Sequence, residues 1–382
     1  MQSPAFTFAT ATEIRFGRGE AARAVSDLSA LGRRILLVHG SSPARCEWLR
    51  AALEAQGCTV TGFSVSGEPD VTMIEAGISA GRGCEAQVVV ALGGGAVIDA
   101  GKAIAALIPT TRPMTDHLEV VGKGIPLDNA PLPFAAIPTT SGTGAEVTRN
   151  AVIAVPAASR KVSLRDRRML PHIAIIDPAL TDTCPPDVTL ASGLDAITQV
   201  MEPYLCTRAN PMTDALCRDA IPKGLVALRS LLEAPDPKAR HMMAWVSLCG
   251  GLALANAGLG VVHGLAGPLG GLSGGSHGAI CGALLPHGLT ANANAADNPG
   301  LTSRLDEIRH WITEAFGGTQ VEAFARLAKW SRDHGLPGLD AQGVTGVHRM
   351  KAAEMAASSS SMKSNPVSLD VSQLLKIMET AR

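Results

Sequence analysis

An apolar strand that runs straight into three glycines and a helix constrains the fold of this chain more than any other feature. QVVVAL, Gln87 to Leu92, is followed directly by Gly93, Gly94 and Gly95. A run so rich in valine predicts a strand buried on both faces, as in parallel sheets. Glycines before a helix let a phosphate approach the backbone and the unpaired N–H groups of the helix start. The stretch predicts a candidate anion site in an α/β sheet, with an ordinary strand-to-helix turn as the alternative.

A second loop of the same kind follows another apolar strand. LPFAAIPTTSGTGAEVT, Leu132 to Thr148, places small hydroxyl side chains around Gly142 and Gly144. Hydroxyl groups beside glycines can bind a phosphate, a ribose or an amide without crowding it. A plain turn explains either loop alone, but two such loops after inner strands predict a shared cofactor cleft.

The end of the first central strand bears on which dinucleotide would bind. RRILLVHG, Arg33 to Gly40, ends in Gly40 and is followed by Ser41, and it lacks the acidic residue that often holds a ribose 2′-hydroxyl. Small hydroxyls with Arg45 nearby favour a 2′-phosphate and hence NADP over NAD. A glycine that merely starts the loop is the alternative.

Length and composition predict two domains. The chain has 382 residues, which is long for one core, and Pro185 and Pro186 form a plausible linker. Apolar strands alternate with helices before this point, and helix formers dominate after it. We therefore predict an α/β dinucleotide-binding domain with a parallel sheet over 1–186 and an all-helical domain over 187–382.

Charge and cysteine usage argue against several classes of protein. The net charge is −1 with acids and bases interspersed, so no nucleic-acid partner is expected. The eight cysteines are scattered, which fits reduced thiols in the cytoplasm, and Cys249 and Cys281 are expected to be core thiols. The chain start lacks the pattern of a signal peptide. The sequence also contains no charge-free apolar run of about 20 residues, so no membrane span is expected.

GGGAVIDAGKA and IPTTSGTGAEVT resemble the two cofactor signatures of the iron-containing (group III) alcohol dehydrogenases, which are related in fold to dehydroquinate synthase and glycerol dehydrogenase. Further matches to this family lie before and after these signatures. In chain order they are GEPD, DPAL, GLDAITQVMEPYL, HGLAGPLGGLSGGSHG and LLPH. The resemblance covers almost the whole chain. It implies that Lys161 approaches the nicotinamide or its phosphates, whereas the rest of the charged segment Arg160 to Arg168 is expected to be a solvated face. With the strand end described above, the predicted dinucleotide-binding residues are Gly40, Ser41, Gly94, Gly95, Ala96, Asp99, Thr139, Thr140, Thr143, Thr148 and Lys161.

The same resemblance implies a metal site of one aspartate and three histidines. The corresponding residues here are Asp195, Gln199, His263 and His277. Gln199 stands where a histidine is usual, and an amide oxygen is a poorer ligand than imidazole for a late first-row metal. Gly267 stands where many relatives place a further histidine near the nicotinamide. Two imidazoles and a carboxylate with an open position can still hold zinc or ferrous iron.

Three functions follow as hypotheses. The first is NAD(P)-dependent interconversion of a small alcohol and its aldehyde or ketone, with Fe or Zn in an interdomain cleft and with Asp195, His263, His277 and Lys161 as catalytic residues. The second is a metal-independent reductase of the same fold, similar to maleylacetate reductases. The third, a dehydroquinate synthase-type lyase or a binding protein, ranks last because few basic residues surround Asp195 and His263. Since relatives are commonly dimers or larger, a homo-oligomer is expected.

Overall fold

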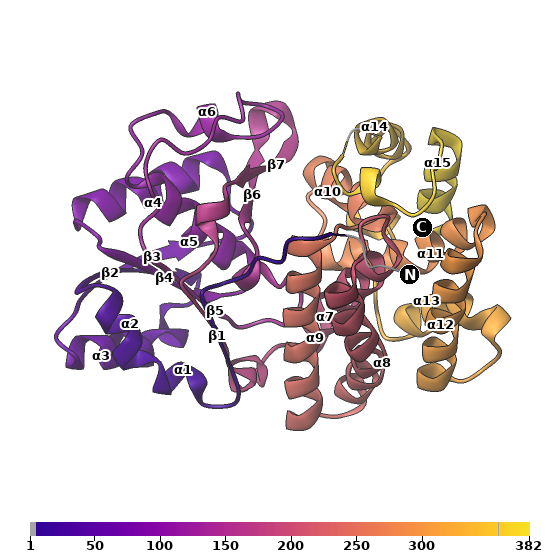
Figure 1. Cartoon of the computed structure of the whole chain (residues 1–382), viewed down its shortest axis with the longest axis horizontal. Helices are drawn as coiled ribbons and strands as arrows, with labels where there is room; N and C mark the ends of the chain where they lie inside the picture. Colours follow the sequence, from indigo (N-terminus) through magenta and orange to yellow (C-terminus); the bar gives the residue numbers. More distant parts are fainter. Residues whose placement is uncertain (1–4, 358) are drawn as a thin grey trace. The chain divides into compact units, whose positions relative to one another are not determined.

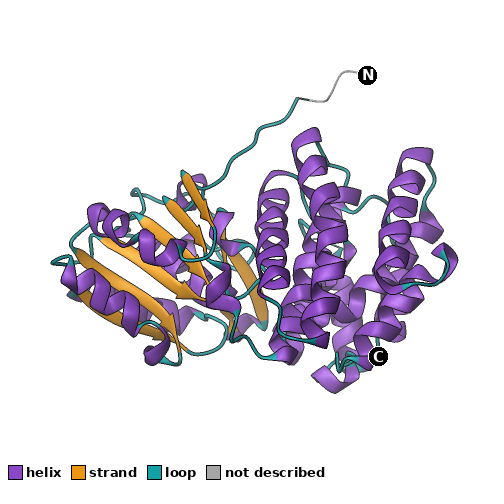
Figure 2. Cartoon of the chain, turned by 90° about the horizontal axis from the view of Figure 1, so that it is seen from below, coloured by secondary structure: helices purple, strands orange, loops and turns teal. Residues whose placement is uncertain are grey.

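The computed structural model describes residues 5–357 and 359–382, which form two compact units. The α/β unit comprises Thr10–Thr140 and Gly144–Asp182. The helical unit comprises Thr183–Arg382, the loop segment Ser141–Thr143 and, near the start of the chain, the described residues 5–9. Figure 1 follows the elements along the chain, and Figure 2 shows strands in one unit and helices throughout the other.

The α/β unit is built on six parallel strands in the order β1-β8-β5-β4-β2-β3, which confirms the predicted fold class. The strands are β1 (Glu13–Phe16), β2 (Arg34–Gly40), β3 (Thr59–Val65), β4 (Val88–Gly93), β5 (Phe134–Pro138) and β8 (Ile173–Ile176). All residues of β4 are buried, as its valine run predicts. Alternate residues of this strand face different apolar layers, because Val88 and Val90 pack in one cluster and Val89 and Ala91 in the other.

Helices cover both faces of this sheet. Those of the α/β unit are α1 (Glu20–Arg23), α2 (Val25–Leu31), α3 (Glu47–Ala55), α4 (Val71–Gly83), α5 (Gly95–Leu107) and α6 (Met114–His117), with 3-10 turns η1 (Pro43–Arg45), η2 (Ala145–Val147), η3 (Pro156–Ala158), η4 (Arg167–Met169) and η5 (Pro178–Thr181). Leu28 of α2 and Leu49 of α3 pack on one face, and Ile74 of α4 and Ile98 of α5 pack on the other. Strands β4, β5 and β8 are buried along their whole length, whereas β1 and β3 at the edges of the sheet contain exposed residues.

A hairpin outside the main sheet corrects the interpretation of the segment Arg160 to Arg168. Strand β6 (Asn150–Val155) pairs antiparallel with β7 (Arg160–Arg165). Val162 and Leu164 of β7 are buried, although charged residues flank them in the sequence. Apolar residues at every second position turn to one face of a strand, so the charged side chains between them face the other way.

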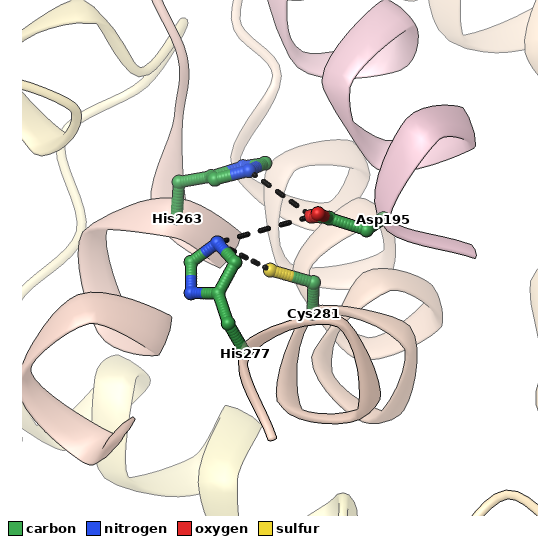
Figure 3. A group of neighbouring side chains, drawn as sticks. All are labelled: Asp195, His263, His277 and Cys281. Carbon is green, nitrogen blue, oxygen red and sulfur yellow. Dashed lines mark hydrogen bonds and ion pairs between the residues drawn. The ribbon is translucent and has the colours of Figure 1, made fainter. Parts of the chain in front are cut away.

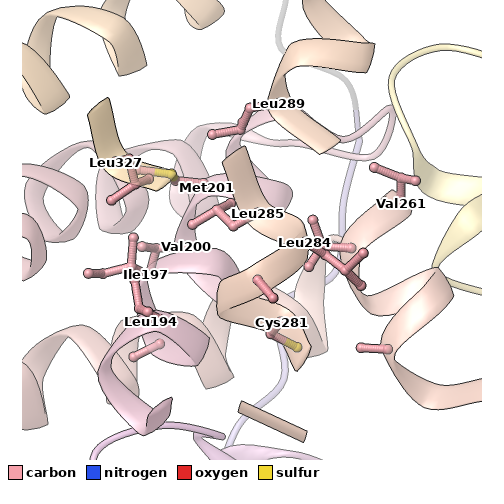
Figure 4. Close-up of a cluster of buried hydrophobic side chains, with 14 of the residues drawn as sticks. Leu194, Ile197, Val200, Met201, Val261, Cys281, Leu284, Leu285, Leu289 and Leu327 are labelled. Carbon is pink, nitrogen blue, oxygen red and sulfur yellow. The ribbon is translucent and has the colours of Figure 1, made fainter. Parts of the chain in front are cut away.

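The helical unit contains α7 (Pro186–Leu205), α8 (Pro211–Glu233), α9 (Pro237–Asn256), α10 (Val261–Ser273), α11 (His277–Ala295), α12 (Pro299–Phe316), α13 (Ala323–Asp333), α14 (Gly346–Ala356) and α15 (Val371–Thr380), with 3-10 turns η6 (Gln320–Glu322), η7 (Asp340–Gln342) and η8 (Met362–Ser364). Helices α7 and α11 contribute Leu194, Ile197, Leu284 and Leu285 to its core (Figure 4). Over the described residues, no single helix has the length and apolarity needed to cross a membrane; α9 and α10 pass that test only as a pair, bent by 97°.

Candidate dinucleotide edge and metal-binding cluster

The predicted glycine loops lie at one edge of the sheet. Strands β2, β4 and β5 are parallel neighbours, so their carboxyl ends, at Gly40, Gly93 and Pro138, face the same way. The chain leaves β2 toward β3 in one direction and leaves β4 toward β5 in the other. Open parallel sheets bind ligands at such a switch point, outside the carboxyl ends of the strands.

The two loops are held side by side at this edge. The backbone N–H of Thr139 donates to the carbonyl of Gly93 at 2.9 Å, and a Cβ added to Gly94 would lie 3.5 Å from the Thr140 side chain. Gly94 caps α5 without a side-chain hydrogen bond to the helix start. A Cβ on Gly93 would lie 2.6 Å from Val97, so glycine lets the helix start directly on the strand. Gly94, Gly95, Ala96, Thr139 and Thr140 are all partly accessible.

Lys102, which was not predicted as a site residue, ties α5 to the second loop. Its buried ammonium donates to the carbonyls of Ala145 at 2.6 Å and Asn150 at 2.8 Å, and to the hydroxyl of Thr148 at 2.8 Å. Burial lowers the pKa of Lys102 to about 8, although the charge of Asp99 opposes this. Thr148 is itself buried, so its hydroxyl serves the packing of the loop. The carboxylate of Asp99 accepts from the backbone N–H of Val152 at 3.0 Å.

The remaining predicted dinucleotide residues differ in their surroundings. Ser41 is exposed just after β2, beside η1 with its exposed Arg45. Lys161 lies on β7, and its ammonium forms an ion pair with the carboxylate of Glu68. Thr143 belongs to the segment that packs with the helical unit.

Three helices of the helical unit bring four potential metal ligands together (Figure 3). Asp195 comes from α7, His263 from α10, and His277 and Cys281 from α11. The Asp195 Oδ1 atom lies 3.5 Å from His263 Nε2 and 3.9 Å from His277 Nε2. His277 Nε2 lies 3.6 Å from the sulfur of Cys281, and all four ligand atoms lie within 4.8 Å of one another.

Two buried atoms of this cluster face each other without a hydrogen-bond partner. They are Asp195 Oδ1 and His263 Nε2. The other ring nitrogen of His263, Nδ1, lies 2.7 Å from a carboxylate oxygen of Glu202. An Nδ1–H that donates to Glu202 leaves Nε2 of a neutral imidazole as an acceptor, so two acceptors meet. Buried acceptors are costly without a positive partner, and the cluster therefore fits a divalent cation.

Comparison with known proteins assigns the chain to a family. The model of the iron-containing alcohol dehydrogenases matches residues 11–178, and that of the C-terminal region of the Fe-containing alcohol dehydrogenase family matches residues 189–382. The chain belongs to the iron-containing alcohol dehydrogenase family. It is an oxidoreductase.

Individual relatives agree with this assignment. The chain is 33% identical to alcohol dehydrogenase 4 of Saccharomyces cerevisiae (strain YJM789), over 86% of this chain and 85% of that protein. It is 33% identical to 1,3-propanediol dehydrogenase of Citrobacter freundii over the same shares. A crystal structure of a 1,3-propanediol oxidoreductase superposes with a TM-score of 0.90 and 29% identity, over 99% of this chain and 100% of that chain.

Gln199 is the fourth residue that the resemblance places at the metal site. Its side chain is buried on α7, and its amide nitrogen donates to the carbonyl of Thr143 at 2.6 Å. The amide nitrogen is thus used within the protein. A Cβ added to Gly267, the other departure from the family pattern, would meet no atom within 4 Å beyond its chain neighbours and its own helix backbone.

The charges of the cluster attract positive charge. Burial alone would raise the pKa of the Asp195 carboxyl, but its interactions with His263 and His277 outweigh this and lower the pKa. The charge of Cys281 raises the pKa of His277 to about 9 against the effect of burial. Burial lowers the pKa of His263, but Cys281, Asp195 and Glu202 together raise it well above its usual value.

Cys281 and Glu202 were not predicted as site residues, although the sequence contains a signal for each of them. Cys281 follows His277 by four residues and Glu202 follows Asp195 by seven, so each pair lies on one helix face. The expectation that Cys281 is a core thiol was incomplete, because the residue is buried but its sulfur contacts His277.

Proposed function

We propose that this oxidoreductase transfers a hydride between NAD(P) and a small alcohol, aldehyde or ketone, assisted by a divalent cation held by Asp195, His263 and His277. The observation that carries the proposal is the pair of facing acceptors, Asp195 Oδ1 and His263 Nε2, buried 3.5 Å apart. The relatives named as dehydrogenases of alcohol and 1,3-propanediol support a small alcohol as substrate.

The α/β unit supplies the dinucleotide-binding edge. Small, partly accessible residues line it, so a pyrophosphate can approach the N-terminus of α5 between Gly94 and Thr140. Lys102 keeps the second loop in place through three hydrogen bonds. The unit thus binds and orients the dinucleotide with backbone groups and hydroxyls.

The helical unit supplies the groups that handle the substrate oxygen. Asp195 provides negative charge, and Glu202 fixes the ring of His263 so that Nε2 faces Asp195. A bound divalent cation would stabilise the negative charge that forms on an alkoxide oxygen. We assign His277, which is partly accessible, to the side of the cluster that substrate reaches.

We further propose that NADP is accepted at least as well as NAD. No carboxylate lies between the end of β2 at Gly40 and Arg45, and the residues Ser41, Ser42 and Arg45 in this stretch are exposed. A 2′-phosphate would meet hydroxyls and a cation there instead of a repelling carboxylate.

Oxidation of NADPH and NADH with a panel of small aldehydes tests the activity. In Asp195→Ala, turnover should fall at least about 100-fold, as expected when charge stabilisation of the oxyanion is lost. Dinucleotide affinity should stay close to that of the wild type, because the substituted residue lies in the helical unit. Wild-type turnover in this variant would contradict the assignment of the cluster.

A metal-independent reductase is the second candidate, and one observation favours it. Gln199 stands where the resemblance places a histidine ligand, and its amide nitrogen already donates to the carbonyl of Thr143. Activity that survives exhaustive chelation, with no metal found in the protein, would establish this candidate in place of the first.

A further inference from the structure

Cys281 occupies the place of a fourth ligand in the cluster. It lies one turn after His277 on α11, so both side chains project from the same face of that helix. Its sulfur is 3.6 Å from His277 Nε2 (Figure 3). Figure 4 shows the same residue at the margin of the apolar core, near Leu284 and Leu285.

The spacing of the four ligand atoms matches one tetrahedral cation. Zinc bonds of about 2.0–2.3 Å place neighbouring ligand atoms roughly 3.3–3.7 Å apart in a tetrahedron. Three of the six separations here are 3.5 Å, 3.6 Å and 3.9 Å, and all six are within 4.8 Å. Small adjustments of side chains would bring all four atoms to bonding distance.

Gln199 is the competing ligand, and its chemistry is less suitable. Its amide nitrogen donates to the Thr143 carbonyl, and only a neutral oxygen is left to offer to a metal. A thiolate carries a negative charge, so Asp195 and Cys281 together would balance the two charges of the cation. Because Asp195 and Cys281 are buried, balanced charge favours the Cys281 thiolate over the neutral Gln199 oxygen as the ligand.

We propose that the Cys281 thiolate replaces the missing family histidine as the fourth metal ligand, and that the resulting Asp–His–His–Cys site selects zinc or cobalt over iron. The inference rests on the proposed function only in assuming that a divalent cation is held by Asp195, His263 and His277. A soft sulfur ligand with two imidazoles favours zinc and related metals. Binding forms a metal–sulfur bond and releases the thiol proton to solvent.

Cobalt substitution tests this directly, because a thiolate bound to Co²⁺ gives an intense charge-transfer absorption in the near ultraviolet. The wild-type chain should show this band on titration with Co²⁺. Cys281→Ser should abolish it and weaken zinc binding by more than about 100-fold. Cys249→Ser, which changes another fully buried thiol of the helical unit, should keep both the band and the affinity.

A matched variant separates the two candidate ligands. Gln199→Ala should leave the cobalt band in place and change zinc affinity far less than Cys281→Ser does. A band that persists in Cys281→Ser, or a loss of zinc affinity in Gln199→Ala as large as in Cys281→Ser, would overturn the proposal. Zinc X-ray absorption on the unmodified chain avoids any folding defect of the variants, since one Zn–S distance of about 2.3 Å is expected and only N and O neighbours would contradict it.

The outcomes for the thiolate and for the activity are distinguishable. A cobalt band without any dehydrogenase activity would support the thiolate ligand and contradict the proposed function. Cobalt bound without the band, but lost in Asp195→Ala, would keep the metal site and reject Cys281 as its ligand.

Discussion

Two buried charged groups, Lys102 in the α/β unit and Asp195 in the helical unit, differ in how many hydrogen bonds the protein gives them. The ammonium of Lys102 is 1% exposed and donates to three oxygen atoms at 2.6–2.8 Å. Asp195 is 2% exposed, yet its Oδ1 has no hydrogen-bond partner among the described residues and faces a second such atom on His263. The first charge is satisfied by three hydrogen bonds from its own chain, whereas the second has only ion pairs with two histidines, at 3.5 Å and 3.9 Å.

The difference separates a structural site from a functional one. A compensated buried charge joins segments of the fold, here α5 and the loop that ends at Thr148. An uncompensated pair of acceptors lowers stability unless a ligand of opposite charge binds. The comparison therefore predicts how each unit responds to substitution, pH and metal.

The largest effect on stability is expected at Lys102. Lys102→Met should destabilise the chain by about 3–5 kcal/mol, because it leaves buried acceptors without a donor. Denaturant unfolding measures this, and Lys223→Met, at an exposed ion pair with Asp219, should cost less than about 1 kcal/mol. Equal losses of unfolding free energy in the two variants would show that Lys102 does not hold α5 to the second loop.

Glu146, whose charge interacts with that of Lys102, should give a pH-dependent effect on stability. Burial raises the pKa of its carboxyl from 4.5 to about 7. Between these values the native state binds more protons than the unfolded state, so wild-type stability falls as pH rises through this window. Glu146→Gln removes this dependence, and its stability relative to the wild type should improve by up to about 3 kcal/mol from pH 4.5 to pH 7. A difference that does not change with pH would contradict the raised pKa.

Metal removal should distinguish Asp195 from Lys102. In metal-free protein, Asp195→Asn should lower stability by less than Lys102→Met does, since Oδ1 makes no hydrogen bond and loses only its ion pairs with His263 and His277. Zinc at 100 times its Kd should stabilise the wild type by about 2.7 kcal/mol and the variant hardly at all. Thermal unfolding with and without chelator measures both. A large loss in the metal-free variant would mean that Asp195 is already compensated.

The smallest predicted change concerns the support of His263. In Glu202→Gln an amide N–H₂ can face Nδ1, which favours the tautomer with a proton on Nε2 and removes the lone pair that would bind metal. Zinc affinity should fall about 10-fold, or about 1.4 kcal/mol. Glu307→Gln, whose carboxylate pairs with Arg218, should bind zinc as the wild type does. Unchanged affinity in Glu202→Gln would leave Glu202 with a packing role only.

Much of the α/β unit could be predicted from sequence. Inner parallel strands need continuous apolar residues, so β4 and β5 were visible as such, and the glycines that follow β4 marked the start of α5. The hairpin of β6 and β7 was missed because its charged residues hide an alternating pattern.

The sequence by itself determined the family, the parallel sheet with its glycine loops, and three of the candidate ligands, because these depend on spacing within one element or on a recognisable motif. Only the tertiary structure decided that Cys281 joins Asp195, His263 and His277 while the Gln199 amide nitrogen turns to Thr143. These groups come from three helices far apart in the chain, and periodicity within a helix fixes the face of a residue but not the partner that this face meets.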